Sequence, residues 1–446
     1  MLESAISVAV EALSWMEIED IGEREALQKV SKQLKIVDAN SLRLAQIFIF
    51  EVNRRLNFID YLINDKISDN EFYKLTYGVK NFLRMYVYWV LLRRASLKEA
   101  ISFLTAGRRV IGWKDLFQFE FFFGELFTIN IKDILNNLNH IEKVSLRTCH
   151  PKWYVKYVLK TLGKNEGLRV LRKDLEKPLI YLRVNTLKDE EERIVDKLIS
   201  EGVKLEKNKQ LNSVFQVLKS KKPLTKLASY RNGLFHIQDK SSCLSVQAAN
   251  PCPGQVILDL CAAPGSKTSF LAQIMENKGL IYSIDSSMNR MWTWKREMNR
   301  LGVEIAEPII SDISLDLPIR VKADIALIDP PCSGTGIFIK TPSLKWRIDL
   351  KDIEKFSEKQ FRMIRNAANY LKEGGILVYS TCSITLEENE KLIERFLKVQ
   401  PEFKLVNIEP DIGLDALRGL SKCRRLYPHK HESSGFFLAK MIKSTD

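Results

Sequence analysis

Residues 256–268 read VILDLCAAPGSKT, and this stretch decides the fold of the C-terminal half of the chain. Its first five residues form a short apolar run, and the small residues that follow mark a sharp turn into a helix. Similar apolar runs recur at 280–284, 325–328 and 375–379, separated by helical patterns such as 291–301 and 353–371. Apolar strands that alternate with helices predict a parallel sheet with helices on both faces. In such sheets, ligands bind beyond the carboxyl ends of the strands.

The first two of these strand ends carry small and acidic residues. The turn at 261–268 lets the backbone approach a ligand closely, and Ser266 can start and cap the following helix. Asp285 ends the next strand, twenty residues after Gly265, an offset at which a carboxylate typically accepts the hydroxyls of a ribose. The glycine patterns that cradle phosphates are missing. A ribose-bearing ligand without a pyrophosphate, such as S-adenosylmethionine, fits this pattern better, and a plain tight turn is the alternative.

Two further strand ends each carry a cysteine. DPPCSGTG occupies 329–336 and STCS occupies 380–383, so Cys332 and Cys382 are expected on the same rim as the 261–268 turn. Structural cysteines are usually buried inside strands or helices, whereas these two stand in loops. Methylation of carbon-5 of cytosine needs such a set of groups. One thiolate adds to carbon-6, a second thiol assists release, and an acidic group holds the edge of the pyrimidine.

Other uses of the cysteines fit less well. The seven cysteines of the chain include no CxxC pair, and none of the five histidines is tied by sequence to either cysteine loop. A metal site and histidine-assisted cysteine catalysis are therefore disfavoured. A disulfide between Cys332 and Cys382 would be unusual in a reducing compartment, which the sparse and odd number of cysteines indicates.

Length and composition indicate a multidomain globular chain. The 446 residues are 45% hydrophobic and 28% charged, and at about 150 residues a domain they suggest three domains. Neither a membrane span nor a secretory signal is evident, so we expect a cytoplasmic protein. Residues 151–250 hold 21 Lys and Arg against 11 Asp and Glu, which is +10 of the formal net charge of +14. This concentration favours a nucleic-acid partner, with a solvated basic face as the alternative.

The patterns divide the chain into three expected domains. Residues 1–145 read as helices, and one buried helix face is predicted by the three- and four-residue spacing of Ala45, Phe48, Ile49, Val52, Leu56 and Ile59. Residues 146–235 alternate short apolar runs with lysine-rich turns such as 219–223, which indicates a small mixed α/β region. Residues 236–446 form the α/β domain.

Together these motifs closely resemble those of the RsmB/NOP (Sun) family of RNA 5-methylcytosine methyltransferases. The matching segments in the α/β domain are CAAPGSKT, Asp285 with Arg290, Asp312, DPPCSGTG, STCS, and the acidic tail Glu387-Glu388-Asn389-Glu390. Further matches are Arg183-Val184-Asn185, Gln238-Asp239, Pro428-His429 and Gly435-Phe436-Phe437. The matches lie within residues 150–440 and are highly specific as a set.

The resemblance implies a multidomain fold and a substrate class. It implies an all-α NusB-like RNA-binding domain at 1–145, to which Leu42–Ala45 and Tyr77–Val79 are similar, and a junction at His150–Trp153. It further implies a basic linker with a small α/β RNA-binding region at 146–235, and a Rossmann-like S-adenosylmethionine-dependent methyltransferase domain at 236–446. The implied activity is methylation of carbon-5 of a cytosine in small-subunit ribosomal RNA, by a monomer that associates with no membrane.

The resemblance also assigns roles to residues. It implies Cys382 as the nucleophile and Cys332 as the cysteine that promotes release of the product, with Asp329 and Lys267 beside them in catalysis. The methionine part of the donor would be lined by Cys261, Ala262, Ala263, Pro264, Gly265, Ser266 and Lys267. Asp285 would hold the ribose, Asp312 the adenine, and Asp329 would stand between donor and base, with Arg290 also at the donor. Ser266 departs from the second glycine of many bacterial members.

Three other functions compete with this interpretation. The first is a cytosine-5 methyltransferase of tRNA. The second is an adenine amino-group methyltransferase, which usually has an aromatic residue after Asp-Pro-Pro, where this chain has Cys332. The third is a non-catalytic RNA-binding ribosome-assembly factor, which would need neither Cys332 nor Cys382.

Overall fold

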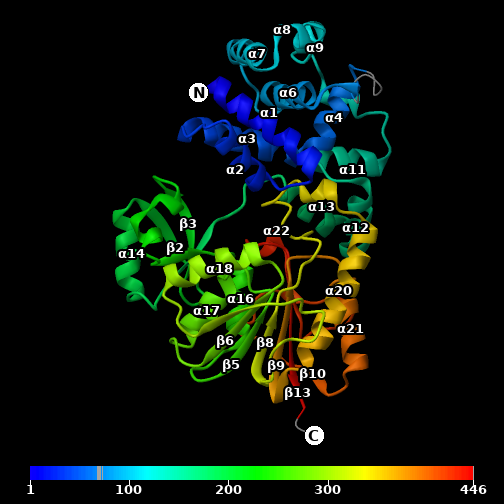
Figure 1. Cartoon of the computed structure of the whole chain (residues 1–446). Helices are drawn as coiled ribbons and strands as arrows, with labels where there is room; N and C mark the ends of the chain where they lie inside the picture. The colour runs from blue at the N-terminus through cyan, green and yellow to red at the C-terminus, as the bar shows by residue number, and fades with distance from the viewer. Residues whose placement is uncertain (68–71, 73, 445–446) are drawn as a thin grey trace. The chain divides into compact units, whose positions relative to one another are not determined.

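The computed structural model of the chain describes residues 1–67, 72 and 74–444, which form two compact units (Figure 1). The first unit comprises Met1–Lys177 and Phe338–Ile348. The second comprises Pro178–Ile337 and Asp349–Asp446. Among the described residues, no helix is long and apolar enough to cross a membrane.

The first unit is built from helices around one apolar core. Its elements are α1 (Leu2–Glu19), α2 (Glu23–Gln33), α3 (Ala39–Arg54), α4 (Leu56–Asn64), α6 (Tyr77–Val87), a π-helix (Tyr88–Leu92), α7 (Leu97–Ile111), α8 (Trp113–Phe117), α9 (Glu120–Glu125), α10 (Ile131–Ile134), α11 (His140–Thr148), α12 (Lys152–Leu162), α13 (Lys164–Lys173) and α19 (Leu344–Arg347). The apolar face predicted at 45–59 is divided between α3 and α4, because Arg55 (φ −124°, ψ 20°) interrupts the helix. Ala45, Phe48 and Ile59 on that face are all fully buried.

A segment from the C-terminal half of the sequence completes this helical unit. The Lys345 side chain is fully buried, and its Nζ donates to the carbonyl oxygens of Arg54 at 2.9 Å and Cys149 at 2.7 Å. These carbonyls lie at the C-terminal ends of α3 and α11, where helix dipoles favour a cation. Burial nevertheless lowers the pKa of Lys345 to about 8.

The second unit begins with a small antiparallel sheet in the order β2-β3-β1-β4. Its elements are β1 (Tyr181–Val184), α14 (Glu191–Ser200), β2 (Val203–Lys207), β3 (Val214–Ser220), α15 (Ala228–Arg231) and β4 (Phe235–Ile237). Leu182, Val184 and Phe235 of the sheet pack against Ile194 and Leu198 of α14. The basic stretch at 151–250 is thus shared, because α12 and α13 belong to the first unit.

A larger mixed sheet forms the rest of the second unit, in the order β11-β12-β13-β9-β8-β5-β6-β7. The strands β5 (Val256–Leu260), β6 (Leu280–Asp285), β7 (Ala306–Ile310), β8 (Ala323–Ile328) and β9 (Leu371–Thr381) are parallel. The strands β10 (Phe403–Leu405), β11 (Leu414–Asp415), β12 (Arg424–Leu426) and β13 (Phe436–Lys443) pair antiparallel. The four apolar runs of the sequence all lie in parallel strands, as predicted.

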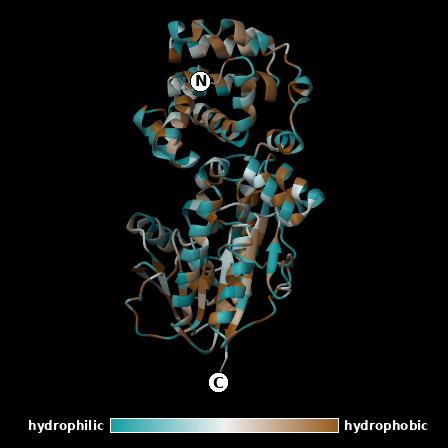
Figure 2. Cartoon of the chain, turned by 90° about the vertical axis from the view of Figure 1, so that its right-hand side faces the viewer, coloured by the Kyte–Doolittle hydropathy of each residue, from teal (hydrophilic) through white to brown (hydrophobic). Residues whose placement is uncertain are grey.

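Helices cover both faces of this sheet, also as predicted. Leu258 and Leu260 of β5 point to the core shared with α20 (Leu350–Ala368) and α21 (Glu390–Val399). Ile257, which precedes Leu258, points to the opposite core, with α16 (Lys240–Ala249) and α17 (Ser266–Ile274). The remaining helices are α18 (Met288–Leu301) and α22 (Pro428–His431). In Figure 2, hydrophobic (brown) and hydrophilic (teal) residues alternate within the helices, as expected for helices with one buried face.

Candidate active site

The carboxyl ends of the parallel strands bring the candidate residues to one edge of the sheet. The 261–265 loop follows β5, Asp285 ends β6 and Asp312 follows β7. Asp329 follows β8, and Cys382 follows β9. Because these strands are parallel neighbours, the loops beyond their carboxyl ends lie side by side.

The two loop cysteines face each other. The Sγ atoms of Cys332 and Cys382 are 3.1 Å apart, and both side chains are partly exposed. The Gly336 backbone N–H donates to the Cys382 carbonyl oxygen at 2.8 Å, which joins the two loops. A Cβ atom at Gly336 would lie 2.1 Å from the Gly435 carbonyl oxygen, so only glycine permits this approach.

The environment of Cys332 keeps its thiol protonated. Its hydrogen bond with Cys382, its burial and the negative charges nearby raise the pKa of Cys332 well above the ordinary value. The negative groups that contribute are the carboxylates of Glu388 and Asp329. Cys332 therefore holds a proton beside the sulfur of Cys382.

Lys267 and Asp329 form an ion pair on the same rim. Lys267 Nζ lies 2.5 Å from Asp329 Oδ2, while Asp329 Oδ1 accepts from Ser380 Oγ at 3.2 Å. Burial alone would lower the pKa of Lys267, but the adjacent carboxylates of Asp329 and Asp259 raise it. Lys267 thus remains an ammonium group that fixes the Asp329 carboxylate between β8 and β9.

The loop after β5 is shaped around Asp285. Cys261 and Gly265 both adopt positive φ angles, 68° and 106°, and burial raises the pKa of Cys261 above its ordinary value. Asp285 is only 2% exposed, and its Oδ2 accepts from the Ala263 N–H at 3.2 Å. Arg290 pairs with the same carboxylate at 3.3 Å and donates to the Ala263 carbonyl. Asp285 and Arg290 thereby clamp the loop from the neighbouring strand end.

The other residues predicted to bind the methyl donor lie in this loop or at the neighbouring strand ends. Ala262 is buried and Pro264 exposed. Asp312 Oδ1 accepts from both the N–H and the hydroxyl of Ser314, which lowers the pKa of Asp312. The prediction that Ser266 starts the helix α17 is confirmed, but the prediction that it caps this helix is wrong. Gly265 is the N-cap of α17 and Ser266 its first residue, and the hydroxyl of Ser266 pairs instead with His236 Nε2 at 2.9 Å.

The sequence analysis assigned no role to two buried carboxylates near this rim. Asp259 lies in β5, and its Oδ2 accepts from Thr268 Oγ1 at 2.5 Å, while Oδ1 has no hydrogen-bond partner. Burial raises the pKa of Asp259 to about 6. In the sequence, Asp259 could have been noticed as a charged residue inside an otherwise apolar run. Glu388 is fully buried beside both cysteine loops, and its signal was the acidic tail after STCS.

A second buried cluster of polar side chains attaches the small sheet to α17, the helix that follows the 261–265 loop. Arg183 of β1 is fully buried, and it donates to Gln238 Oε1 at 2.9 Å and to Ser269 Oγ of α17 at 2.8 Å. Burial lowers the pKa of this guanidinium to about 10. The Arg183-Val184-Asn185 motif of the sequence therefore has a structural partner in α17.

The chemistry of the rim fits S-adenosylmethionine. The polar groups at the ends of β6, β7 and β8 are the carboxylates of Asp285, Asp312 and Asp329, whose oxygens accept hydrogen bonds from hydroxyl groups and attract a cationic ligand. Asp259, with its unpartnered buried oxygen, adds a further negative group under the loop. A nucleotide phosphate would instead meet these carboxylates at close range.

Comparison with known proteins identifies the family. Residues 246–442 match the model of the 16S rRNA methyltransferase RsmB/F family, and residues 150–222 match its ferredoxin-like domain. A probable ribosomal RNA small subunit methyltransferase B of Synechocystis is 30% identical over 69% of this chain and 70% of its own length. The chain belongs to the RsmB/F methyltransferase family. The protein of the same name in Bacillus subtilis is 29% identical over 99% of both chains.

The similarity to solved structures extends over nearly the whole length of this RsmB/F-family protein. The crystal structure of PH0851 covers 99% of both chains, with a TM-score of 0.84 and 28% identity. The structure of NSun6 from Pyrococcus horikoshii with SFG, an analogue of S-adenosylmethionine, has a TM-score of 0.62 and 27% identity. It covers 66% of this chain and 99% of the NSun6 chain. The predicted fold, a helical N-terminal region followed by a Rossmann-like methyltransferase domain, is confirmed.

Proposed function

We propose that this protein transfers a methyl group from S-adenosylmethionine to carbon-5 of a cytosine in small-subunit ribosomal RNA. The single observation that carries the proposal is the pair of thiols, Cys332 and Cys382, held 3.1 Å apart beside Asp329 on the rim of a methyltransferase sheet. The names of the relatives in Bacillus subtilis and Synechocystis favour the small-subunit RNA as substrate.

Each residue of the rim takes one part of the reaction. The Cys382 thiolate attacks carbon-6 of the cytosine, forming a carbon–sulfur bond and placing electron density on carbon-5. Asp329, held by Lys267, faces the nitrogen edge of the pyrimidine and stabilises the charge that arises on addition. Bond formation at carbon-6 removes the hydrogen bond with Cys382 that most favours the protonated form of Cys332, so Cys332 then loses its proton to water. After carbon-5 is methylated, the Cys332 thiolate takes the carbon-5 proton, and the electron pair of that bond restores the double bond between carbon-5 and carbon-6. The bond between carbon-6 and sulfur breaks at the same time, which releases Cys382 as a thiolate.

The donor site belongs to the loop after β5. S-adenosylmethionine, when bound, supplies an electrophilic methyl group. The residues Cys261 to Lys267 would line its methionine part, while Asp285 and Arg290 hold the loop in shape. Asp312 would lie toward the adenine. The electropositive stretch at 151–250 and the helical domain would bind the RNA, because basic residues near phosphates gain free energy by releasing counterions.

The decisive experiment separates the roles of the two cysteines. RNA that carries tritium on carbon-5 of its cytosines should release tritium to water with the wild-type protein and S-adenosylmethionine. Cys382→Ala should release none and form no covalent adduct. Cys332→Ala should attack but stall before elimination, leaving an RNA adduct that survives denaturing electrophoresis. An adduct with Cys382→Ala, or full turnover by either variant, would refute these assignments.

A methyl-transfer assay identifies which RNA is the substrate. Small-subunit RNA and tRNA from cells that lack the gene should be offered separately, with S-adenosylmethionine labelled in the methyl group. Label in 5-methylcytosine of the ribosomal RNA supports the proposal, whereas label in tRNA alone establishes the tRNA enzyme. Label on adenine would establish the amino-group enzyme, and binding without any transfer would establish an assembly factor.

A further inference from the structure

The buried carboxylate of Glu388 lies between the two cysteine loops. Its Oε1 accepts from the Ser333 N–H at 2.8 Å, and its Oε2 accepts from the Ser333 hydroxyl at 2.5 Å. Oε2 also accepts from the hydroxyls of Ser383 at 2.6 Å and Thr385 at 2.7 Å. Ser333 directly follows Cys332, and Ser383 directly follows Cys382. One carboxylate therefore fixes the residue next to each thiol.

A further partner of Glu388, Gln360, holds the residue that precedes Cys332. Gln360 of α20 is fully buried, and its Nε2 donates to Glu388 Oε1 at 3.0 Å and to the Pro331 carbonyl at 2.9 Å. Both of these oxygens can only accept hydrogen bonds, which settles the orientation of the amide. The hydroxyl of Tyr379 in β9 lies 3.2 Å from Gln360 Oε1 and 2.7 Å from the Glu388 carbonyl oxygen, to which it donates. Cys332 thus has a tethered neighbour on each side, and both tethers end on Glu388.

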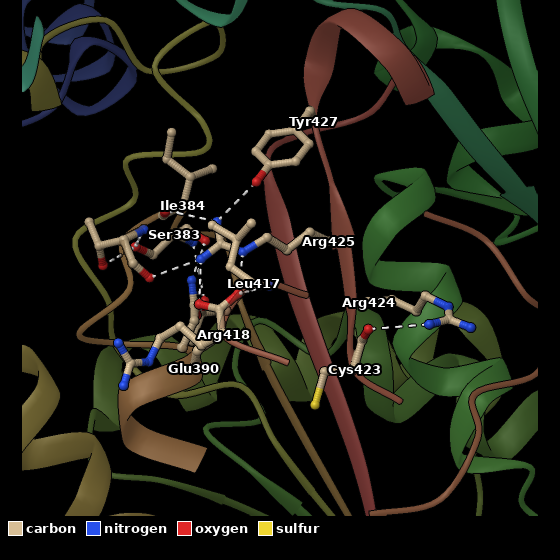
Figure 3. A network of polar contacts seen from close by, with 12 residues as sticks. Ser383, Ile384, Glu390, Leu417, Arg418, Cys423, Arg424, Arg425 and Tyr427 are labelled. Atoms are coloured by element: carbon tan, nitrogen blue, oxygen red, sulfur yellow. Dashed lines mark hydrogen bonds and ion pairs between the residues drawn. The ribbon is translucent and has the colours of Figure 1, made fainter. Parts of the chain in front are cut away.

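The next two residues hold the Cys382 loop independently of Glu388. Asn389 accepts from Thr381 Oγ1 at 2.6 Å and donates to the Ser383 carbonyl at 2.9 Å. Glu390 forms a bidentate pair with Arg425, and Arg425 donates to the Ile384 carbonyl at 2.9 Å (Figure 3). Because this second network anchors the loop, a change at Glu388 should leave the fold in place while loosening the link between the loops.

The charge of Glu388 acts on the same thiol pair. Glu388 is one of the groups whose negative charge raises the pKa of Cys332, after the hydrogen bond to Cys382 and burial. The carboxylate therefore favours the protonated form of Cys332 while it fixes the position of its loop. Glu388 does not cap α21, because the N-cap of that helix is Asn389.

We infer that Glu388 is a positioning residue that sets the separation of the Cys332 and Cys382 thiols, and thereby links attack on the base to release of the product. The inference rests on the proposed function for its catalytic consequence, but the thiol separation itself can be measured without RNA.

The test compares Glu388→Gln with Glu387→Gln in the full chain. The Glu387 carboxylate pairs with Lys391 at the surface, so its replacement is a matched control. Phenylarsine oxide bridges two thiols only when they lie close together, and Cys382→Ala gives the background. Wild type and Glu387→Gln should bind this probe with affinities within twofold, and Glu388→Gln should bind at least fivefold more weakly. Tritium release by Glu388→Gln should fall at least tenfold, with the KM for S-adenosylmethionine within twofold of wild type.

The outcomes separate this inference from the proposed function. Unchanged probe binding by a folded Glu388→Gln variant would overturn the positioning role, whatever its activity. No tritium release by the wild type would overturn the proposed function and leave the probe measurement valid. If Glu388→Gln does not fold, Ser333→Ala and Ser383→Ala each remove one donor. Both should weaken probe binding two- to fivefold, and wild-type affinity in both would equally refute the inference.

Discussion

The ion pair between Arg425 and Glu390 gives a quantitative test of how the Cys382 loop is anchored. Arg425 Nε and Nη2 each lie 2.5 Å from an oxygen of Glu390, and the two side chains are 1% and 0% exposed. Replacing Arg425 by Met would leave the Glu390 carboxylate buried without its cation. Breaking such a pair from one side costs about 3–5 kcal/mol. At about 2–4 °C per kcal/mol for a domain of this size, the melting temperature should fall by roughly 6–20 °C.

Scanning calorimetry of four variants checks this magnitude. Arg425→Met and Glu390→Leu should each be strongly destabilised, because each leaves one charge buried without its partner. The double variant Arg425→Met/Glu390→Leu should lose less than the two single losses combined, because neither charge is left unpaired. Arg418→Met breaks the bidentate pair with Glu394 on the surface, and it should shift the transition only slightly.

Two results would refute the reasoning. A melting temperature of Arg425→Met within about 2 °C of wild type would mean that the buried pair contributes little. A double variant as unstable as the combined single losses would mean that the two side chains act separately. Because Arg425 also holds the Ile384 carbonyl, two residues after Cys382, tritium release should fall in parallel with stability.

Three further predictions address the donor, the helical domain and the RNA. Asp285→Ala should weaken S-adenosylmethionine binding by about 1.5–3 kcal/mol, roughly 10- to 160-fold, and titration calorimetry giving wild-type affinity would contradict this. Burial lowers the pKa of His150 from 6.5 to about 4, so its stabilising contribution is complete above pH 6.5 and is lost as the pH falls toward 4. Over that window wild type should lose about 3 kcal/mol more than His150→Gln, and parallel pH profiles in urea unfolding would disprove it. Three exposed lysines lie at the end of β3 and just after it: Lys219, Lys221 and Lys222. Replacing all three by glutamate should weaken RNA binding and flatten its salt dependence. An unchanged salt dependence would mean that these lysines only face solvent.

Local patterns in the sequence were sufficient for the central part of the fold. The apolar runs identified four strands, because strands buried on both faces must be continuously apolar. Parallel topology places the loops that follow these strands on one rim of the sheet. The sequence alone therefore predicted that Cys332, Cys382 and Asp285 lie on the same rim. The edge strand β7 escaped this reasoning because its sequence, AEPII, is mostly exposed and contains a proline.

Only the tertiary structure decided which distant residues hold that rim. Glu388 and Ser333 are 55 positions apart, and Lys345 lies 291 positions from the Arg54 carbonyl that it binds. A carboxylate in an acidic stretch and a lysine in the four-residue helix α19 have no periodicity that distinguishes a buried partner from a solvated charge. Their roles follow from burial, because a polar group removed from water must find a partner wherever the folded chain provides one. The sequence therefore indicated the residues that we propose for the chemistry, and the packing of the folded chain decided which other residues hold them in place.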